Sequence, residues 1–333
     1  MRILVVGAVS GATVDIGSSL AHAFSGLGEE CRFLDFSEYE QEFRKVDSVR
    51  KDVDMHGFVI RLQTRLLEEV ILFNPYLIIG LAQSPLNNLE VLDSFRKSGI
   101  KLHYWFLEDY RVFQYWSKIA PKFDHFFTIQ KSPILQELKN LGCNNGYYLP
   151  AAFDDSVVFK ESVHQSINCE AQVSFVGAPY RNRIELFNSL KMPGLEIYGE
   201  GWDGLSTLVK IGSRRITSSE RRHIYANSKI NLNLHSSSHA EGAWSGDFVN
   251  PRTFEIAGLG GFQLTDARKL LPLHFDLKNE IPVFSSASAM LDAIQYYLDH
   301  ELERNEMAAN SRARVLKEHT YRHRAMEILS LAS

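Results

Sequence analysis

The segment VNPRTFEIAGLGGFQLTD, residues 249–266, combines residue types that could bind a nucleotide. Pro251 suits the first turn of a helix, and the free N–H groups after it, together with the helix dipole, would attract an anion. Glu255 lies roughly one turn further on, where its carboxylate could accept hydrogen bonds from the paired hydroxyls of a ribose. The alternative is that Glu255 only places a favourable negative charge near the positive end of the helix dipole.

Two arginines follow another expected strand that ends in glycine. In VSFVGAPYRNR, residues 173–183, the strand ends at Gly177, and Arg181 and Arg183 stand at the start of a helix. Glycine lets backbone approach a ligand closely, a helix start offers free N–H groups, and arginine can hold phosphate with two hydrogen bonds. The alternative is an ordinary turn with two solvated arginines.

Two more strand ends combine glycine or histidine with a loop. In LEIYGEGW, the backbone at Gly199 could read the edge of a nucleobase near Trp202, or the segment is a plain turn with a packed tryptophan. His235 follows the apolar run 230–234 and precedes a Ser- and Gly-rich loop of the kind that often carries function. A structural histidine is the alternative there. Asp247 stands eight residues before Glu255, an acidic-x7-Glu spacing.

Alternating strands and helices must position these residues. Short apolar runs such as RILVVG, YLIIGL and KLHYWF alternate with helical patterns in the first half, and VSFV, LEIY and INLNL restart the alternation in the second. Two further helices close the chain. This order predicts two α/β domains with mostly parallel sheets. Gly7 and Gly11 are the wrong distance apart for a GxGxxG motif, which counts against a dinucleotide-binding enzyme.

Length and composition restrict the possible functions. The chain has 333 residues, more than one core usually organises, and 45% are hydrophobic. A net charge of −4 argues against a nucleic-acid-binding protein. No apolar run is long enough for a transmembrane segment, and the first run lacks the features of a signal peptide, so we expect a cytoplasmic protein. Cys31, Cys143 and Cys169 are far apart, which fits reduced thiols and no metal site.

The order and spacing of these motifs resemble those of the CgeB-like (spore-maturation-type) family of GT-B glycosyltransferases. NPRTFEIAGLGGFQLTD is similar to the family's segment of Arg, a hydrophobic residue, Glu, a small-residue helix, Gly and a short strand ending in Thr-Asp. VSFVGAPYRNR, IYGEGW and YANSKINLNLH precede it in the family's order, and the closing helices with HTYRHR are similar too. The resemblance covers residues 170–331 and extends more loosely to WFLEDY and FDHFFTIQ.

The resemblance implies a GT-B fold, with two Rossmann-like domains whose parallel sheets face across a cleft. The expected domains are an acceptor-side domain 1–152, a linker 153–170, a nucleotide-sugar-binding domain 171–317, and a C-terminal helix 318–333 that crosses back to the first domain. The implied activity is of hexosyltransferase type, from a nucleoside-diphosphate-sugar donor to a hydroxyl acceptor on a glycan or protein. Two alternatives stay open: a nucleotide-sugar 2-epimerase, and a non-catalytic GT-B protein for binding or assembly.

The resemblance also implies roles for individual residues at the donor. Glu255 would bind the ribose, and Arg181 and Arg183 would face the diphosphate with help from the amides near Arg252 and Thr253. The remaining donor-binding residues would be Gly177, Gly199, Trp202 and His235. GT-B enzymes usually work without a bound metal, because a helix dipole and basic residues take up the charge of the leaving diphosphate. We therefore expect no metal and no cofactor besides the donor, for which a UDP-sugar is favoured.

Three carboxylates are candidates for the catalytic group. Asp15 and Asp109 lie in the first half and could act as a base on the acceptor, or could instead be a helix cap and a structural carboxylate. Asp247 stands where related retaining families carry Glu. Whether the configuration of the sugar is retained or inverted stays open.

Overall fold

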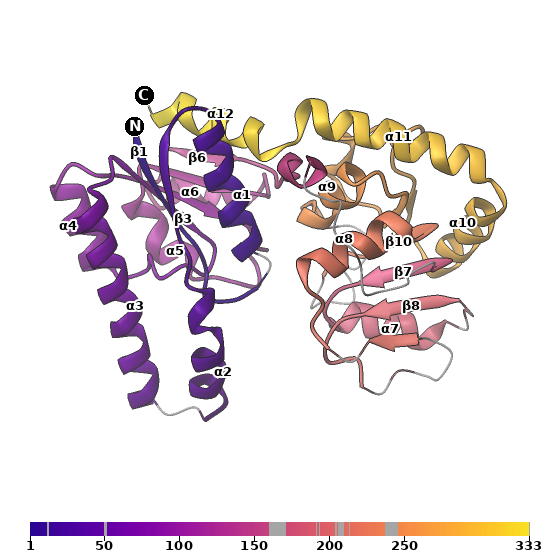
Figure 1. Ribbon diagram of the computed structural model, residues 1–333, viewed down its shortest axis with the longest axis horizontal. Helices are drawn as coiled ribbons and strands as arrows, with labels where there is room; N and C mark the ends of the chain where they lie inside the picture. Colours follow the sequence, from indigo (N-terminus) through magenta and orange to yellow (C-terminus); the bar gives the residue numbers. More distant parts are fainter. Residues whose placement is uncertain are drawn as a thin grey trace. The chain divides into compact units, whose positions relative to one another are not determined.

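The computed structural model describes residues 1–11, 13–49, 52–159, 171–190, 192, 194–203, 205, 210–212, 214–236 and 246–332. The chain divides into two compact units (Figure 1). The N-terminal unit consists of Met1–Pro150 and Tyr321–Ser333, and the C-terminal unit consists of Ala151–Thr320. Residues 160–170 of the predicted linker lie outside the described residues.

The N-terminal unit contains a parallel sheet, in which the described residues form six strands in the order β2-β1-β3-β4-β5-β6. These strands are β1 (Arg2–Val6), β2 (Glu30–Leu34), β3 (Leu77–Leu81), β4 (Lys101–Phe106), β5 (His125–Thr128) and β6 (Gly146–Tyr148). Successive side chains on a strand point to opposite faces, and Ile3, Leu4, Val5 and Val6 are all fully buried. Both faces of the sheet are therefore covered, as is usual for parallel sheets.

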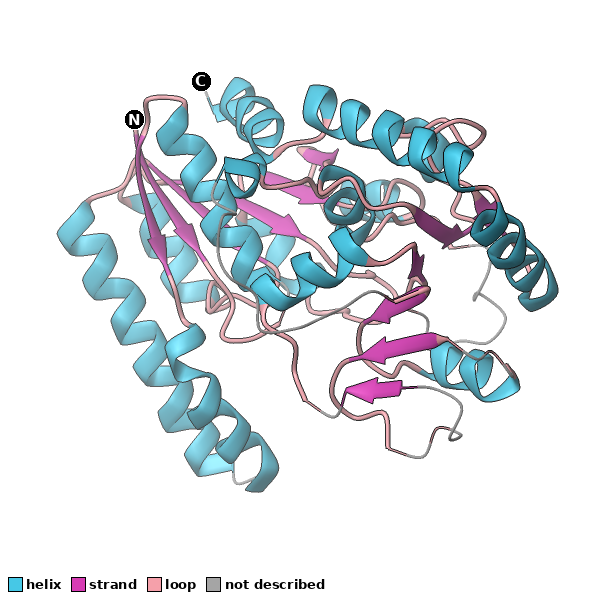
Figure 2. Ribbon diagram, turned by 45° about the vertical axis from the view of Figure 1, so that its right-hand side comes forward, coloured by secondary structure: helices cyan, strands magenta, loops and turns pink. Residues whose placement is uncertain are grey.

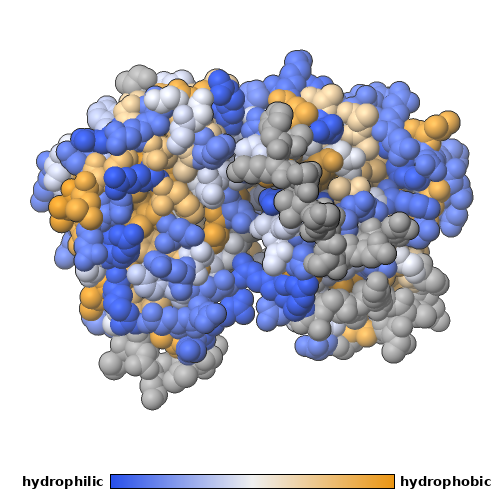
Figure 3. Space-filling model, viewed as in Figure 1, coloured by the Kyte–Doolittle hydropathy of each residue, from blue (hydrophilic) through white to orange (hydrophobic). Residues whose placement is uncertain are grey.

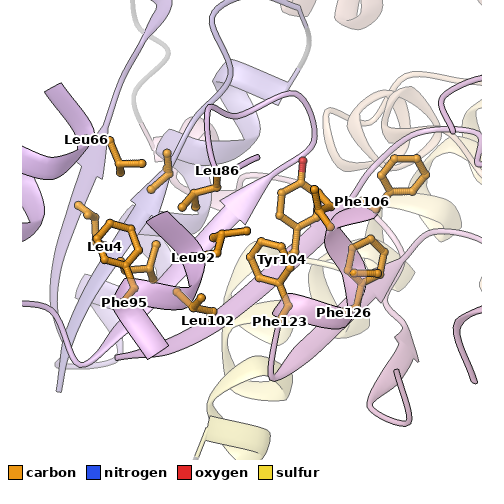
Figure 4. Packing of buried hydrophobic residues seen from close by; sticks show 14 of the residues in the cluster. Leu4, Leu66, Leu86, Leu92, Phe95, Leu102, Tyr104, Phe106, Phe123 and Phe126 are labelled. Carbon is orange, nitrogen blue, oxygen red and sulfur yellow. The ribbon is translucent and has the colours of Figure 1, made fainter. Parts of the chain in front are cut away.

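Helices cover the two faces of this sheet (Figure 2). They are α1 (Thr13–Gly26), α2 (Glu40–Val49), α3 (Asp52–Phe73), α4 (Leu89–Lys97), α5 (Trp116–Ile119), α6 (Ile134–Asn140) and α12 (Tyr321–Ala332). On one face Leu66 of α3 and Leu92 of α4 belong to the same apolar cluster as Leu4 and Tyr104 of the sheet (Figure 4). The C-terminal helix α12 packs on α1, and Arg324 Nε donates a hydrogen bond of 2.8 Å to the Pro150 carbonyl.

The C-terminal unit repeats this architecture. Its described residues form a parallel sheet in the order β12-β11-β10-β7-β8-β9. The strands are β7 (Val173–Val176), β8 (Leu195–Tyr198), β9 (Lys210–Gly212), β10 (Ile230–Asn233), β11 (Gln263–Asp266) and β12 (Val283–Phe284). The helices are α7 (Arg181–Ser189), α8 (Ser218–Asn227), α9 (Pro251–Gly258), α10 (Ala287–Asp299) and α11 (Glu301–Glu318).

The structure confirms the predicted alternation and the parallel sheets, and adds elements that the sequence did not indicate, among them α2 and β9. Helix α2, with the sequence EQEFRKVDSV, is mostly polar, so its few apolar residues gave no clear helical period. Strand β9 has three residues at the edge of the sheet, too few for a recognisable alternation.

The strand order reverses once in each sheet, between β1 and β3 in the N-terminal unit and between β7 and β10 in the C-terminal unit. The loops that follow the two strands run in opposite directions there, which leaves space at the carboxyl ends of the strands. Open α/β sheets bind their ligands at such places. We call them the N-terminal and the C-terminal switch point.

Polar and apolar residues are interspersed on the face shown in Figure 3. Among the described helices, none is both long and apolar enough to cross a membrane.

Candidate functional site

Two arginines meet beside Gly177, which follows β7 at the C-terminal switch point. A Cβ atom at Gly177 would lie 2.8 Å from Arg252 Nη2 and 3.2 Å from Arg183 Nη1. Any other residue at position 177 would therefore press on both guanidinium groups. The guanidinium carbons of Arg183 on α7 and Arg252 on α9 lie 5.2 and 5.3 Å from the centroid of the Phe175 ring. The ring supports both cations at the end of the strand.

Neutral oxygen atoms are the hydrogen-bond partners of these two arginines. Arg183 donates to the carbonyls of Ala178 and Leu234, at 2.9 and 2.6 Å. Arg252 Nε donates to the Tyr225 hydroxyl at 3.1 Å. Within the part of the chain that the structure describes, neither arginine forms an ion pair with a carboxylate.

The electrostatics follow from this geometry. Burial, and next the positive charge of Arg252, lower the pKa of Arg183 to about 9. A lowered arginine pKa means that the positive charge is poorly compensated where it lies. An anionic group placed between the two guanidinium groups would supply the missing negative charge, and phosphate fits arginine donors geometrically.

Glu255 lies on α9, one turn after Pro251. Both of its carboxylate oxygens accept from Arg221 Nε on α8, at 3.0 and 3.1 Å, and its side chain remains 21% exposed. A carboxylate offers about four lone-pair positions, and one shared N–H uses only part of this capacity. Arg221 therefore orients Glu255, which can still accept hydrogen bonds from a ligand.

Tyr225 connects Glu255 with the arginine pair. It follows Arg221 by four residues on α8, and its buried hydroxyl accepts from Arg252. Burial raises the pKa of Tyr225, while the charge of Arg252 acts to lower it and that of Glu255 to raise it. The phenol is thus a neutral acceptor for Arg252 and lies within the field of both charged groups.

A chain of buried polar groups fixes the start of α9. Asn250 is the N-cap, and its side-chain oxygen accepts from the Thr253 amide at 3.0 Å. His235 Nε2 accepts from the Asn250 amide at 3.0 Å, so the ring proton is on Nδ1, which donates to Asp266 at 2.7 Å. Asp266 also binds Arg268.

His235 is therefore neutral and serves as a positioning residue. Burial lowers its pKa to about 4, although the charge of Asp266 acts in the opposite direction. Both ring nitrogens are used inside the protein, and the ring is fully buried. Thr253 is also fully buried, and its hydroxyl accepts from Asn233 at 2.8 Å. The Asn250 side chain already accepts a hydrogen bond from the Thr253 amide. The expected contact of this amide with a diphosphate therefore stays a prediction.

Gly199 and Trp202 shape the neighbouring strand end. Gly199 has φ of 146°, and a Cβ atom on it would lie 2.4 Å from the Gly177 carbonyl. The Trp202 indole donates to the same carbonyl at 2.9 Å, and its ring packs against Phe175 and Phe187. Trp202 is only 2% exposed, which leaves little of its surface for a nucleobase. The expected contact with a nucleobase therefore also stays a prediction.

Arg181 and Asp247 lie in other surroundings. Arg181 is the first residue of α7, forms an ion pair of 2.7 Å with Glu185, and has a side chain that is 71% exposed. Asp247 is half-buried in the segment that leads to the Asn250 cap. Of the predicted donor residues, the structure brings together Gly177, Arg183, Arg252 and Glu255, with His235 and Thr253 behind them.

The two candidate carboxylates of the N-terminal unit lie in different surroundings. Asp15 is exposed in the first turn of α1. Asp109 follows β4 and forms an ion pair of 2.7 Å with Arg111. Burial by itself raises the pKa of Asp109, but hydrogen bonds from Arg111 hold it below the ordinary value.

Glu108, next to Asp109, was missed at the sequence level. Its side chain accepts from Gln83 and, at 3.0 Å, from the Tyr115 hydroxyl. Burial raises the pKa of Glu108 despite these two hydrogen bonds. The only sequence signal was its place in the WFLEDY segment, which does not distinguish two neighbouring carboxylates.

Other site residues were missed because their partners are distant in sequence. Arg221, Tyr225 and Asp266 contact predicted site residues, and Arg268 in turn pairs with Asp266. The four-residue spacing of Arg221 and Tyr225 places both on one face of α8, which was a usable signal. Among the described residues, no group of three or more His, Cys, Asp or Glu side chains could hold a metal ion.

Comparisons with known proteins agree with this fold. Residues 181–330 match a family model described as glycosyl transferase-like. The spore protein CgeB of Bacillus subtilis (strain 168) is 23% identical over 226 residues, which cover 63% of this chain and 68% of CgeB. Sucrose-phosphate synthase from Thermosynechococcus elongatus has a TM-score of 0.65 at 11% identity, covering 99% of this chain and 98% of that one. HepE from Anabaena, solved with UDP-glucose, has a TM-score of 0.61 at 10% identity, with 99% of each chain covered.

The two parallel sheets and these structural likenesses define a GT-B fold. The match to the glycosyl transferase-like family model covers most of the C-terminal unit and much of α12. The predicted resemblance to the CgeB-like glycosyltransferases is confirmed, because both the family model and CgeB match this chain.

Proposed function

We propose that this protein is a metal-independent hexosyltransferase whose C-terminal unit binds a nucleoside-diphosphate-sugar. The observation that carries the proposal is the arginine pair. Arg183 and Arg252 lie together at a strand end beside a helix start, and their partners are neutral oxygens. A diphosphate would provide the anionic oxygens that these guanidinium groups lack.

Glu255 supplies the second half of the proposed donor site. Arg221 holds its carboxylate in place, and the free lone pairs suit two neighbouring hydroxyls of a ribose. A ribose bound at Glu255 and a diphosphate bound at the arginine pair together describe a nucleoside diphosphate. HepE, which shares this fold, was solved with UDP-glucose, which supports UDP as the first nucleotide to test.

The proposed reaction needs charge stabilisation when the donor bond breaks. An acceptor hydroxyl gives up its proton, its oxygen bonds to the anomeric carbon, and the nucleoside diphosphate leaves with the electron pair of the broken C–O bond. Arg183 and Arg252 would stabilise the additional negative charge on the leaving diphosphate. Two fixed positive charges can fill the part that a divalent cation plays elsewhere, so we propose catalysis without a metal.

Glu108 of the N-terminal unit is our candidate for the group that takes the acceptor proton. A base works best when its pKa is near the working pH, and burial raises the pKa of Glu108 toward that range. Asp109 is a weaker candidate, because its hydrogen bonds with Arg111 hold its pKa low. The proposed acceptor is a hydroxyl group on a glycan or protein.

Calorimetric binding of UDP, GDP, dTDP, CMP and NAD tests the donor site. We expect one nucleoside diphosphate to bind, and Glu255→Ala to weaken it at least tenfold, about 1.4 kcal/mol. Glu185→Ala is the matched control, since Glu185 is also a helical carboxylate paired with an arginine, but its partner is the exposed Arg181. Addition of EDTA should leave the affinity unchanged within about twofold.

The outcomes separate the remaining alternatives. If no nucleotide binds and Glu255→Ala stays folded, the carboxylate is structural and the non-catalytic alternative is favoured. If a nucleotide binds but a UDP-sugar is converted to its 2-epimer without any acceptor, the protein is an epimerase. Transfer of the sugar to an added acceptor supports the proposal.

A further inference from the structure

A cavity of about 180 Å³ lies at the N-terminal switch point, entirely within the N-terminal unit. Its walls come from the loop after β1, from helices α2 and α3, and from the loop after β3. The lining residues are Val9, Ser10, Phe43, Met55, Phe58, Val59, Leu62, Gln63, Gln83, Ser84, Pro85 and Asn87. It thus occupies the position in its sheet that the arginine pair occupies in the other sheet.

The size and lining of this cavity restrict its ligand. A cavity of roughly 150 Å³ with apolar walls accepts benzene, so this one has room for a single ring with a small substituent. Phe43 and Phe58 form an aromatic wall, with ring centroids 5.9 Å apart, and Leu62 adds an aliphatic surface. None of the described lining residues is charged. A charged ligand would lose its hydration without a compensating partner.

One buried polar atom in the lining needs a hydrogen-bond donor. Gln63 is only 8% exposed, and its Nε2 donates to the Pro85 carbonyl, which fixes the orientation of the amide. Gln63 Oε1 has no hydrogen-bond partner among the described residues. A buried carbonyl oxygen without a donor is unfavourable, and a ligand hydroxyl or N–H group would satisfy it.

Gln83 connects the cavity with Glu108. Its φ is +63°, which is uncommon for a residue other than glycine and is often retained at functional positions. Its backbone N–H donates to the Tyr115 hydroxyl at 2.9 Å, and its side chain donates to Glu108. The lining of the cavity and the half-buried carboxyl of Glu108 therefore belong to one hydrogen-bonded group of residues.

From these observations we infer that the cavity binds an uncharged, ring-sized apolar group that carries one hydrogen-bond donor, such as a phenol. The ring packs against Phe43, Phe58 and Leu62, and the donor reaches Gln63 Oε1. The assignment of this group to the acceptor of sugar transfer rests on the proposed function, whereas the binding itself does not.

Binding of 4-methylphenol and of toluene to the whole chain, measured by ligand-observed NMR, tests the inference. We expect 4-methylphenol to bind at one saturable site and toluene to bind at least fivefold more weakly, because toluene has no donor for Gln63. Val59→Trp should weaken 4-methylphenol at least tenfold by filling the cavity. Ile60→Trp is the control, since Ile60 is the next residue on α3, is also exposed, and is absent from the lining.

Three results would overturn the inference: no saturable binding of 4-methylphenol, equal affinities for the two compounds, or equal effects of the two tryptophan variants. Val59 is 40% exposed, so its replacement should leave the core intact, and circular dichroism checks this. The test uses no nucleotide. If 4-methylphenol binds and no nucleotide binds, the cavity assignment stands and the proposed sugar transfer is ruled out. If a nucleotide binds and 4-methylphenol does not, the proposed transfer stands and the cavity assignment is wrong.

Discussion

The two switch points occupy the same topological position in two parallel sheets, yet their side chains differ in kind. At the C-terminal switch point Arg183 and Arg252 place two positive charges beside Gly177. At the N-terminal switch point the cavity is lined by apolar and neutral polar residues, with Gln63 as its buried acceptor. Sheet topology creates space in both units, and the side chains determine whether an anion or a neutral ring suits that space.

The difference extends to the ionisable groups around each position. In the C-terminal unit an arginine loses part of its basicity, since burial and a neighbouring cation lower the pKa of Arg183 to about 9. In the N-terminal unit burial raises the pKa of the Glu108 carboxyl. A poorly compensated positive charge suits a leaving diphosphate, and a carboxyl with raised pKa suits proton transfer.

Glu108→Gln should have the largest effect, because it removes the proposed base. We expect the rate of sugar transfer to fall by roughly 10²–10⁴-fold, as is usual for loss of a general base. The affinity for the nucleoside diphosphate should stay unchanged, since Glu108 belongs to the N-terminal unit. Single-turnover transfer and calorimetry measure the two quantities, and Asp109→Asn is the matched variant. A greater loss in Asp109→Asn would assign the proton transfer to Asp109 instead.

Arg252→Ala should weaken the nucleoside diphosphate by about 100-fold, or about 2.8 kcal/mol. The reason is the loss of one of two guanidinium groups at the proposed diphosphate position. Arg181→Ala should change the affinity less than about twofold, since the Arg181 side chain is 71% exposed and paired with Glu185. Equal losses in the two variants would show that general positive charge, and not the buried pair, binds the nucleotide.

The buried histidines should make folding stability depend on pH in both units. Burial lowers the pKa of His235 to about 4 and that of His103 to about 3, from an ordinary value of 6.5. Below pH 6.5 the unfolded chain binds protons that the folded chain does not. The free energy of unfolding should therefore fall as the pH is lowered from 6.5 toward 4, by on the order of 1–3 kcal/mol per histidine.

Thermal unfolding between pH 7.5 and 4.5 measures this dependence. His235→Gln should reduce the dependence of the melting temperature on pH that comes from the C-terminal unit. His103→Phe should reduce the dependence that comes from the N-terminal unit. A wild-type melting temperature that stays constant between pH 6.5 and 4.5 would contradict the assignment of both histidines as buried and neutral.

Tyr225→Phe should have the smallest effect on the donor site. It removes only the hydroxyl that accepts from Arg252 Nε, so the affinity for the nucleoside diphosphate should fall about threefold to tenfold. Tyr180→Phe is the control, because Tyr180 contacts Arg183 through its ring. If Tyr180→Phe weakens binding as much as Tyr225→Phe, the hydroxyl of Tyr225 does not position Arg252.

The sequence by itself determined the alternation of elements and the chain positions of the proposed donor residues. Strands such as RILVV and VSFV were recognisable because continuous apolar runs are needed where both faces of a sheet are buried. Pro251 and Asn250 marked the start of α9, since a cap and a first-turn proline are local features. Glu255 could be singled out because its place in this helix start follows from local spacing.

Only the tertiary structure decided which of these residues act together. Arg181 and Arg183 are two residues apart, so they point about 200° apart around a helix, and packing on the sheet determines which of them is buried. Arg221 reaches Glu255 across 34 residues of chain, and the lining of the N-terminal cavity comes from four separate segments. The periodicity of apolar residues in a sequence predicts only which residues share a face of one helix or strand. The contacts described here depend on how elements that are distant in sequence pack against each other.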